Sequence, residues 1–255
     1  MTKAIQIKHI KIGEGIPKIC VPLTSSTREA LVQEGKAAKE AGAELVEWRA
    51  DFYEEVTKVE KTVETLEELS RVLGELPLLF TLRTEQEGGK FSEDETTYET
   101  INLAVAKSKK ADLIDIEALS DRETKKELIR KLSREGVKVI SSYHDFEKTE
   151  DREGILRIYE SLKESGGDIL KVAVKPKEFE DVTRFMQATK EVTNRTEKPL
   201  IGISMGNTGS ITRIAGENFG SSITFATVGA ASAPGQFRLR ELRMMIHSLH
   251  EKNKE

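Results

Sequence analysis

The sequence has one cysteine, four histidines and no long apolar run. With Cys20 alone, the chain cannot form an internal disulfide, and without HxxxH or CxxC spacing a dedicated metal site has little support. No apolar stretch is long enough to span a bilayer, and the first residues show no signal-peptide pattern. We therefore expect a cytoplasmic protein that needs no metal and does not associate with membranes.

An excess of positive charge is also absent. The formal net charge is −4, and the basic residues are scattered along the chain. This distribution argues against general nucleic-acid binding and against a patch for anionic lipids. Charged residues make up 33% and hydrophobic residues 37% of the 255 positions, which describes a globular chain with ample material for a core.

Eight short apolar runs alternate with charged amphipathic segments from residue 18 onward. Helix-start signals such as Thr27 and Asp121 precede amphipathic segments, and glycines follow several of them. Eight βα units in this length predict a closed parallel barrel, whereas an open doubly wound sheet lacks its Gly-rich fingerprint after the first run. We predict an α/β protein, a single (β/α)8 TIM barrel domain over residues 1–255 with the barrel at 18–255. The runs cover residues 18–24, 45–52, 76–83, 112–119, 138–146, 168–175, 200–206 and 223–229.

The first 17 residues follow a different pattern. Ile5, Ile7, Ile10 and Ile12 alternate with polar residues on either side of a short turn. This spacing predicts a β-hairpin over residues 1–17 that closes the bottom of the barrel. His9 in its turn is expected to be structural.

Two residues stand out in the apolar runs. Lys171 lies within ILKVAV at residues 169–174, and His144 ends the preceding run. A buried ammonium is costly, and burial favours the neutral amine, which can attack a carbonyl. The alternatives without a catalytic role are a lysine that points outward, with its aliphatic stem against apolar neighbours, and a histidine in a loop. If the fold brings both to one face, they indicate Schiff-base chemistry.

Polar residues also interrupt the ends of other runs. Glu47, Arg49 and Asp51 share one face at a two-residue period, and Asp115 and Glu117 repeat the pattern in the fourth run. Their functional interpretation is a pocket for a small, oxygen-rich anion, since an arginine fork matches a carboxylate. The alternative is a structural salt-bridge lattice, which we expect for Asp51 and Asp115.

Two loops add candidates for binding. The segment 206–213 could hold an anion through its backbone amides and Arg213, or Thr208 or Ser210 could simply cap the helix. The small-residue segment 229–236 is suited to a lid over the substrate, with a plain connector as the alternative.

Several motifs in this order resemble type I 3-dehydroquinate dehydratase over essentially the whole chain. They are EWRAD at residues 47–51, FTLR at 80–83 with EGG at 87–89, SYHDF at 142–146, KVA at 171–173, SMG at 204–206 and SAPGQ at 232–236.

The resemblance implies a dimeric barrel enzyme of the shikimate pathway that needs no metal or nucleotide. It implies syn elimination of water from 3-dehydroquinate, giving 3-dehydroshikimate through an imine on Lys171, with His144 as the acid–base group. Glu47 is expected to orient the imidazole of His144. Substrate contacts are implied for Glu47, Arg49, Arg83, Arg213, Ser232 and Gln236, with Glu87 and Met205 as further residues of the site.

Two other functions compete with this interpretation. A class I aldolase would share the lysine and would cleave a carbon–carbon bond. A catalytically silent barrel that binds a carboxylate and regulates a partner would have no need for both Lys171 and His144.

Overall fold

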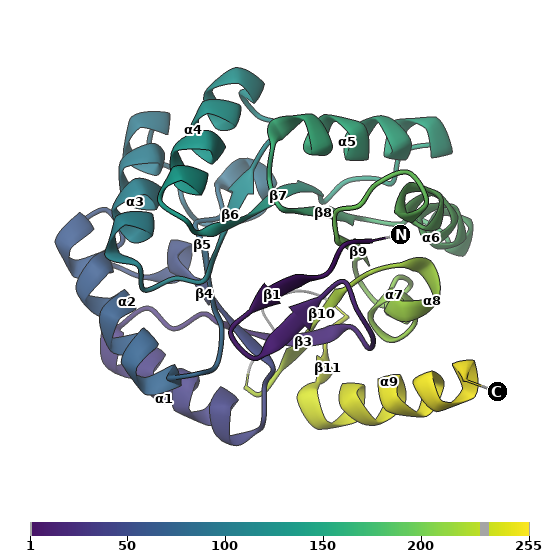
Figure 1. The fold of residues 1–255 in the computed structure, drawn as a ribbon, viewed down its shortest axis with the longest axis horizontal. Coiled ribbons are helices and arrows are strands. Elements are labelled where there is room, and N and C mark those ends of the chain that lie inside the picture. Colours follow the sequence, from purple (N-terminus) through teal and green to yellow (C-terminus); the bar gives the residue numbers. More distant parts are fainter. Residues whose placement is uncertain (1, 230–234, 255) are drawn as a thin grey trace.

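Eight parallel strands form a barrel that the helices surround, in a computed structural model that describes residues 2–229 and 235–254 (Figure 1). Each neighbouring pair from β10 through β3 to β9 is parallel, which confirms the predicted TIM barrel. The barrel strands are β3 (Lys18–Leu23), β4 (Leu45–Arg49), β5 (Leu78–Thr81), β6 (Leu113–Glu117), β7 (Lys138–Asp145), β8 (Ile169–Val174), β9 (Leu200–Ser204) and β10 (Ile223–Thr227).

The helices follow the strands as the amphipathic segments predict. Thr27 caps α1 by accepting a hydrogen bond from the amide of Ala30, whereas Asp121 precedes α4 without a side-chain cap. No helix within the described ranges is both long and apolar enough to cross a membrane. The helices are α1 (Arg28–Glu40), α2 (Val59–Leu73), α3 (Glu95–Ser108), α4 (Arg122–Arg134), α5 (Arg152–Ser165), α6 (Phe179–Thr193), α7 (Ile211–Ile214), α8 (Gly216–Phe219) and α9 (Leu239–Asn253), with 3-10 turns η1 (Ala50–Phe52) and η2 (Glu85–Glu87).

The circle of strands closes between β9 and β10. Leu200 forms a parallel bridge with Ser221, and its carbonyl accepts a hydrogen bond from the amide of Ser222. Further along, the short strand β11 (Phe237–Arg238) pairs with β10 on the side away from β3. Gln236 directly precedes β11, so this pairing fixes its place at the C-terminal end of the barrel.

The N-terminal hairpin fills the opposite end of the barrel, as predicted. Strands β1 (Ile5–Ile7) and β2 (Ile10–Ile12) pair antiparallel and cross the centre of the view in Figure 1. Ile7, Ile10 and Ile12 are buried in one apolar cluster with the first inward residues of the barrel strands, such as Leu45 and Leu113. The hairpin thereby seals the bottom of the barrel.

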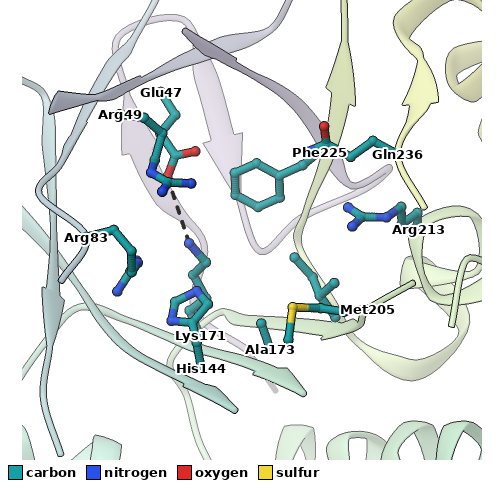
Figure 2. A pocket seen from close by; sticks show the side chains of 11 residues that line it. Glu47, Arg49, Arg83, His144, Lys171, Ala173, Met205, Arg213, Phe225 and Gln236 are labelled. Atoms are coloured by element: carbon teal, nitrogen blue, oxygen red, sulfur yellow. Dashed lines mark ion pairs between the residues drawn. The ribbon is translucent and has the colours of Figure 1, made fainter. Parts of the chain in front are cut away.

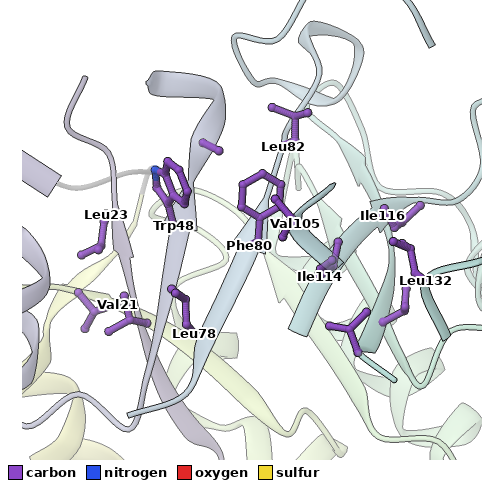
Figure 3. Close-up of a cluster of buried hydrophobic side chains, with 14 of the residues drawn as sticks. Val21, Leu23, Trp48, Leu78, Phe80, Leu82, Val105, Ile114, Ile116 and Leu132 are labelled. Atoms are coloured by element: carbon purple, nitrogen blue, oxygen red, sulfur yellow. The ribbon is translucent and has the colours of Figure 1, made fainter. Parts of the chain in front are cut away.

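Side chains alternate between the barrel interior and the helix layer along each strand. Trp48 and Phe80 point outward and meet edge to face, with ring centroids 5.4 Å apart, in the apolar layer of Figure 3. The intervening residues, Glu47 on β4 and Thr81 on β5, face each other inside, where the Thr81 hydroxyl donates to the Glu47 carboxylate at 2.8 Å. The two-residue period therefore directs the unusual polar residues inward.

Candidate active site

A pocket of about 460 Å³ opens at the C-terminal ends of the strands (Figure 2). Lys171 and His144 both line it, so the fold brings the two unusual residues to one face, as Schiff-base chemistry requires. Their strands, β7 and β8, are neighbours, with His144 in register with Ala173. The remaining lining residues are Glu47, Arg49, Arg83, Ala173, Ile203, Met205, Arg213, Phe225 and Gln236.

Lys171 lies between two carboxylates. Its Nζ is 3.2 Å from Oδ2 of Asp115 and 3.9 Å from Oε1 of Glu47, and the side chain is buried. The ring of Phe225 lies 5.0 Å from the same nitrogen. Lys171 is therefore a buried side chain in an ion-pair arrangement with two carboxylates, which its strand sequence alone does not indicate.

Asp115 contacts Arg83, Ser142 and Lys171 through its two carboxylate oxygens. Its Oδ1 accepts hydrogen bonds from Arg83 at 2.7 Å and from Ser142 at 2.6 Å, while Oδ2 contacts Lys171. Burial alone would raise the pKa of Asp115, but the charges of Arg83 and Lys171 outweigh it and bring the pKa to about 2. These contacts agree with the salt-bridge role expected of Asp115, and they also place its carboxylate against the Lys171 nitrogen.

His144 is oriented by Glu87 and not by Glu47. Its Nδ1 is 2.8 Å from Oε2 of Glu87, and its backbone amide donates to the same oxygen at 3.0 Å. Glu87 ends the 3-10 turn η2. The predicted pairing of Glu47 with the imidazole is wrong, since Glu47 accepts from Thr81 and faces Lys171.

The contacts of Glu87 favour one tautomer of His144. One carboxylate oxygen that already accepts the backbone N–H favours a proton on Nδ1, which leaves Nε2 with its lone pair. Burial lowers the pKa of His144 well below its usual value, with Arg83 and Lys171 acting in the same direction. Burial also raises the pKa of Glu87, as does the nearby Glu117. We therefore expect the imidazole of His144 to be neutral at pH 7, so that it can accept a proton.

Arg83 is the centre of a buried ion-pair network. Its Nη1 is 3.0 Å from Glu117 and 3.4 Å from Glu87, and its Nη2 is 2.7 Å from Asp115. The structure places Arg83 in the pocket wall, as expected of a substrate-binding residue. Much of its fork is nevertheless engaged by these carboxylates, so it also holds Asp115 and Glu87 in place.

Two further arginines reach the pocket from different elements. Arg49 is held by Asp51 through two hydrogen bonds of 2.8 Å, which confirms the structural role expected of Asp51. Arg213 comes from α7 on the other side of the pocket (Figure 2). Burial lowers the pKa of Arg213 to about 10, so the guanidinium remains protonated at neutral pH.

The structure describes the first of the two predicted binding loops, residues 206–213, in full. Neither Thr208 nor Ser210 caps α7 with its side chain; instead the Thr212 hydroxyl bonds the Gly209 carbonyl at 2.8 Å and accepts from the Ser204 amide at 3.1 Å. Arg213 is the one residue of the segment 206–213 that lines the pocket.

In the other loop, Ser232 and the rest of residues 230–234 lie outside the described residues. The predicted lid is therefore not described. Gln236 at its end and Met205 after β9 both line the pocket, as expected.

The site thus combines the elements of imine chemistry on a carboxylated substrate. It has a buried lysine, a histidine held with one nitrogen available, and arginines in the pocket wall. Within the described ranges, no group of three or more His, Cys, Asp or Glu side chains is arranged to hold a metal ion.

The chain is similar to known proteins of one family. The family model for type I 3-dehydroquinase matches residues 19–253. A 3-dehydroquinate dehydratase from Clostridium botulinum is 43% identical over 252 residues, which cover 98% of this chain and 99% of that protein. A second, from Bacillus licheniformis, is 41% identical over 251 residues, with the same coverage.

A solved structure resembles the whole fold. It is the type I 3-dehydroquinate dehydratase from Clostridium difficile, with covalently modified comenic acid. The two structures superpose with a TM-score of 0.95 at 38% identity, over 99% of this chain and 100% of that one.

Proposed function

This chain belongs to the type I 3-dehydroquinase family, and from that premise we propose that it removes water from 3-dehydroquinate through an imine on Lys171. The product is 3-dehydroshikimate, and the reaction makes the protein a hydro-lyase of the shikimate pathway. The observation that carries the mechanism is the meeting of Lys171 and His144 in one pocket that Arg49 and Arg213 also line.

The first step is formation of the imine. The Lys171 ammonium passes a proton to a neighbouring base, and the neutral amine adds to the C3 ketone of the substrate. Protonation of the resulting hydroxyl releases one water and leaves a positively charged imine nitrogen. Because this nitrogen withdraws electrons, the C2 protons become acidic.

The second step is the elimination. Nε2 of His144 removes a proton from C2, and the electron pair moves into an enamine. The same imidazole then donates its proton to the C1 hydroxyl, which departs as water on the same face of the ring. A histidine held through Nδ1 suits both transfers, since one nitrogen serves in turn as base and acid. Water finally hydrolyses the conjugated imine, releasing 3-dehydroshikimate and restoring Lys171.

The arginines provide the binding energy for the anionic substrate. Arg213 is buried and protonated, and a carboxylate can occupy its fork bidentately. We expect the ring hydroxyls to contact Glu47, Gln236 and Arg49, which line the pocket. Asp51 holds Arg49 in place. We propose that Ser232 also contacts the substrate. The C. difficile protein was solved with covalently modified comenic acid, and covalent chemistry is also what we propose for this chain. A cytoplasmic location and a homodimer stay predictions of the same proposal. Cell fractionation would test the location, and sedimentation of the purified protein would test the dimer.

Borohydride trapping with 3-dehydroquinate tests the chemistry and the nucleophile together. We expect a reduced adduct that peptide mapping places on Lys171, and a conjugated enone in the unreduced reaction. Lys171→Ala should give neither adduct nor turnover. Lys175→Ala, a lysine of the same segment that does not line the pocket, is the matched control and should keep both. Two smaller carbon fragments instead of the enone would identify an aldolase, and full turnover by Lys171→Ala would refute the covalent mechanism.

A further inference from the structure

The carboxylate closest to the reactive nitrogen lies outside the pocket. Asp115 Oδ2 is 3.2 Å from Lys171 Nζ, whereas Glu47, at 3.9 Å, belongs to the pocket wall. Asp115 is 1% exposed and does not line the pocket. A substrate that occupies the pocket therefore contacts Glu47, and it leaves the contact between Asp115 and the nitrogen in place.

Asp115 is held rigidly from its other oxygen. The Arg83 guanidinium and the Ser142 hydroxyl donate to Oδ1 at 2.7 and 2.6 Å. Both donors come from the adjacent strands of the barrel or their ends, β5 and β7, so the carboxylate on β6 is fixed between them. A carboxylate that accepts two such bonds remains ionised when buried.

Other charged groups around Lys171 do not replace this contact. Glu47 on β4 is farther away and is shared with Thr81. Cys20 on β3 is buried, which raises the pKa of its thiol and keeps it neutral. Phe225 on β10 presents a ring. The remaining neighbours are the neutral His144 on β7 and the Arg83 cation that follows β5.

We propose that Asp115 is the permanent counter-ion of the Lys171 nitrogen, and that it keeps this nitrogen cationic after the imine has formed. This inference rests on the proposed function and adds a residue that the substrate never touches. Asp115 opposes loss of the ammonium proton, which slows imine formation at neutral pH. In return it stabilises the protonated imine, which is the form that makes the C2 proton acidic.

The proposal predicts opposite effects on two steps when the charge is removed. In Asp115→Asn, the pH midpoint of borohydride-trapped adduct formation should fall by about 1 to 3 units, because one opposite charge within contact distance has gone. Removal of the C2 proton should slow by about tenfold or more, since each pH unit of such a shift changes the protonated fraction of the imine nitrogen tenfold. The isotope effect of C2-deuterated substrate on kcat should rise accordingly. A merely structural role would leave the midpoint unmoved.

Asp51→Asn is the matched control. Asp51 is also buried and also holds an arginine of the site, but it contacts Arg49 and not Lys171. This variant should raise KM and leave the pH midpoint unchanged. An equal fall of the midpoint in both variants would overturn the proposal, because the effect would then come from a loosened arginine.

Ser142→Ala decides the question if Asp115→Asn does not fold. It removes one of the two hydrogen bonds that fix Asp115, so the carboxylate is held less firmly against Lys171 and the midpoint should fall below the wild-type value. An unmoved midpoint in every folded variant would overturn the role of Asp115. Wild-type protein is trapped first: absence of its Lys171 adduct would contradict the proposed function itself, whereas a normal adduct with unmoved midpoints contradicts the counter-ion alone.

Discussion

His144 is the residue whose loss should separate imine formation from proton transfer. In His144→Ala the lysine and its carboxylates remain, so borohydride should still trap an adduct on Lys171. Turnover should fall by about 10²- to 10⁴-fold, the usual contribution of a positioned acid–base group. His247→Ala, an exposed histidine on α9, is the control and should retain full activity. An absent adduct in His144→Ala would show that His144 is needed before the imine forms.

Asp115 should also make stability depend on pH in the acid range. Its folded-state pKa of about 2 is below the usual 3.8, so the unfolded chain binds this proton more readily. The resulting stabilisation, about 2 kcal/mol, is complete above pH 4 and is lost as the pH falls toward 2. Urea titrations from pH 5 to 2 should therefore show the stability gap between wild type and Asp115→Asn narrowing. A constant gap would mean that the charge of Asp115 does not contribute.

Sequence alone identified Lys171 and His144 because each is polar in an otherwise apolar strand. It could not identify their partners. Glu87 lies in a 3-10 turn without any repeating pattern, and its contact with His144 spans 57 residues. Asp115 looked like one more inward carboxylate, and only the strand order β6, β7, β8 and the inward direction of both side chains place it at the lysine nitrogen.

The turn that carries Glu87 depends on the absence of a side chain at Gly88. Gly88 has φ +77°, and a Cβ there would overlap the ring of Phe146. Gly88→Ala should therefore displace Glu87 and disturb His144, lowering kcat by up to about 100-fold. Steady-state kinetics and urea unfolding measure the two effects.

Gly136→Ala separates backbone strain from the clash. Gly136 has φ +83° with open space around its Cβ position. Both variants should lose about 1 kcal/mol of stability from the left-handed backbone, but Gly136→Ala should keep its kcat. Equal kinetics in the two variants would show that the Phe146 contact does not position Glu87.

Strands and helices were more predictable than these turns. The runs 138–146 and 168–175 became β7 (Lys138–Asp145) and β8 (Ile169–Val174), within one residue at each end. The run 76–83 instead yielded the shorter β5 (Leu78–Thr81), because the chain leaves the strand before Arg83, which lines the pocket, and turns to bring Glu87 against His144. Periodicity locates the elements, whereas tertiary contacts determine where each one ends.

The barrel as a whole closes at a seam with few backbone bonds. Between β9 and β10, the Ser221 hydroxyl accepts a hydrogen bond from the Gly202 amide at 3.0 Å. Next to it, the Ser222 amide donates to the Leu200 carbonyl. Ser221→Ala leaves the buried Gly202 amide without this acceptor and should cost about 1–3 kcal/mol. Amide hydrogen exchange at Gly202 should accelerate before that of β7 and β8 amides. Ser222→Ala, which keeps its backbone bond, should be nearly neutral; similar losses in both variants would exclude a special role for the Ser221 hydroxyl.

Counting eight βα units was enough to predict a closed barrel. It did not reveal how the last strand meets the first seven, since the seam uses residues 221 and 222, just before β10 (Ile223–Thr227). Nor did it reveal β11, a two-residue strand too short for any periodic pattern.

The sealed floor of the barrel has a consequence for kinetics. Ile7, Ile10 and Ile12 fill one end, and the pocket opens at the other. Substrate and product must therefore pass through the same opening of the pocket, so 3-dehydroshikimate has to leave before the next 3-dehydroquinate can bind. Accumulating product should slow the enzyme by competing for the vacant pocket, and a large excess of substrate should restore the rate.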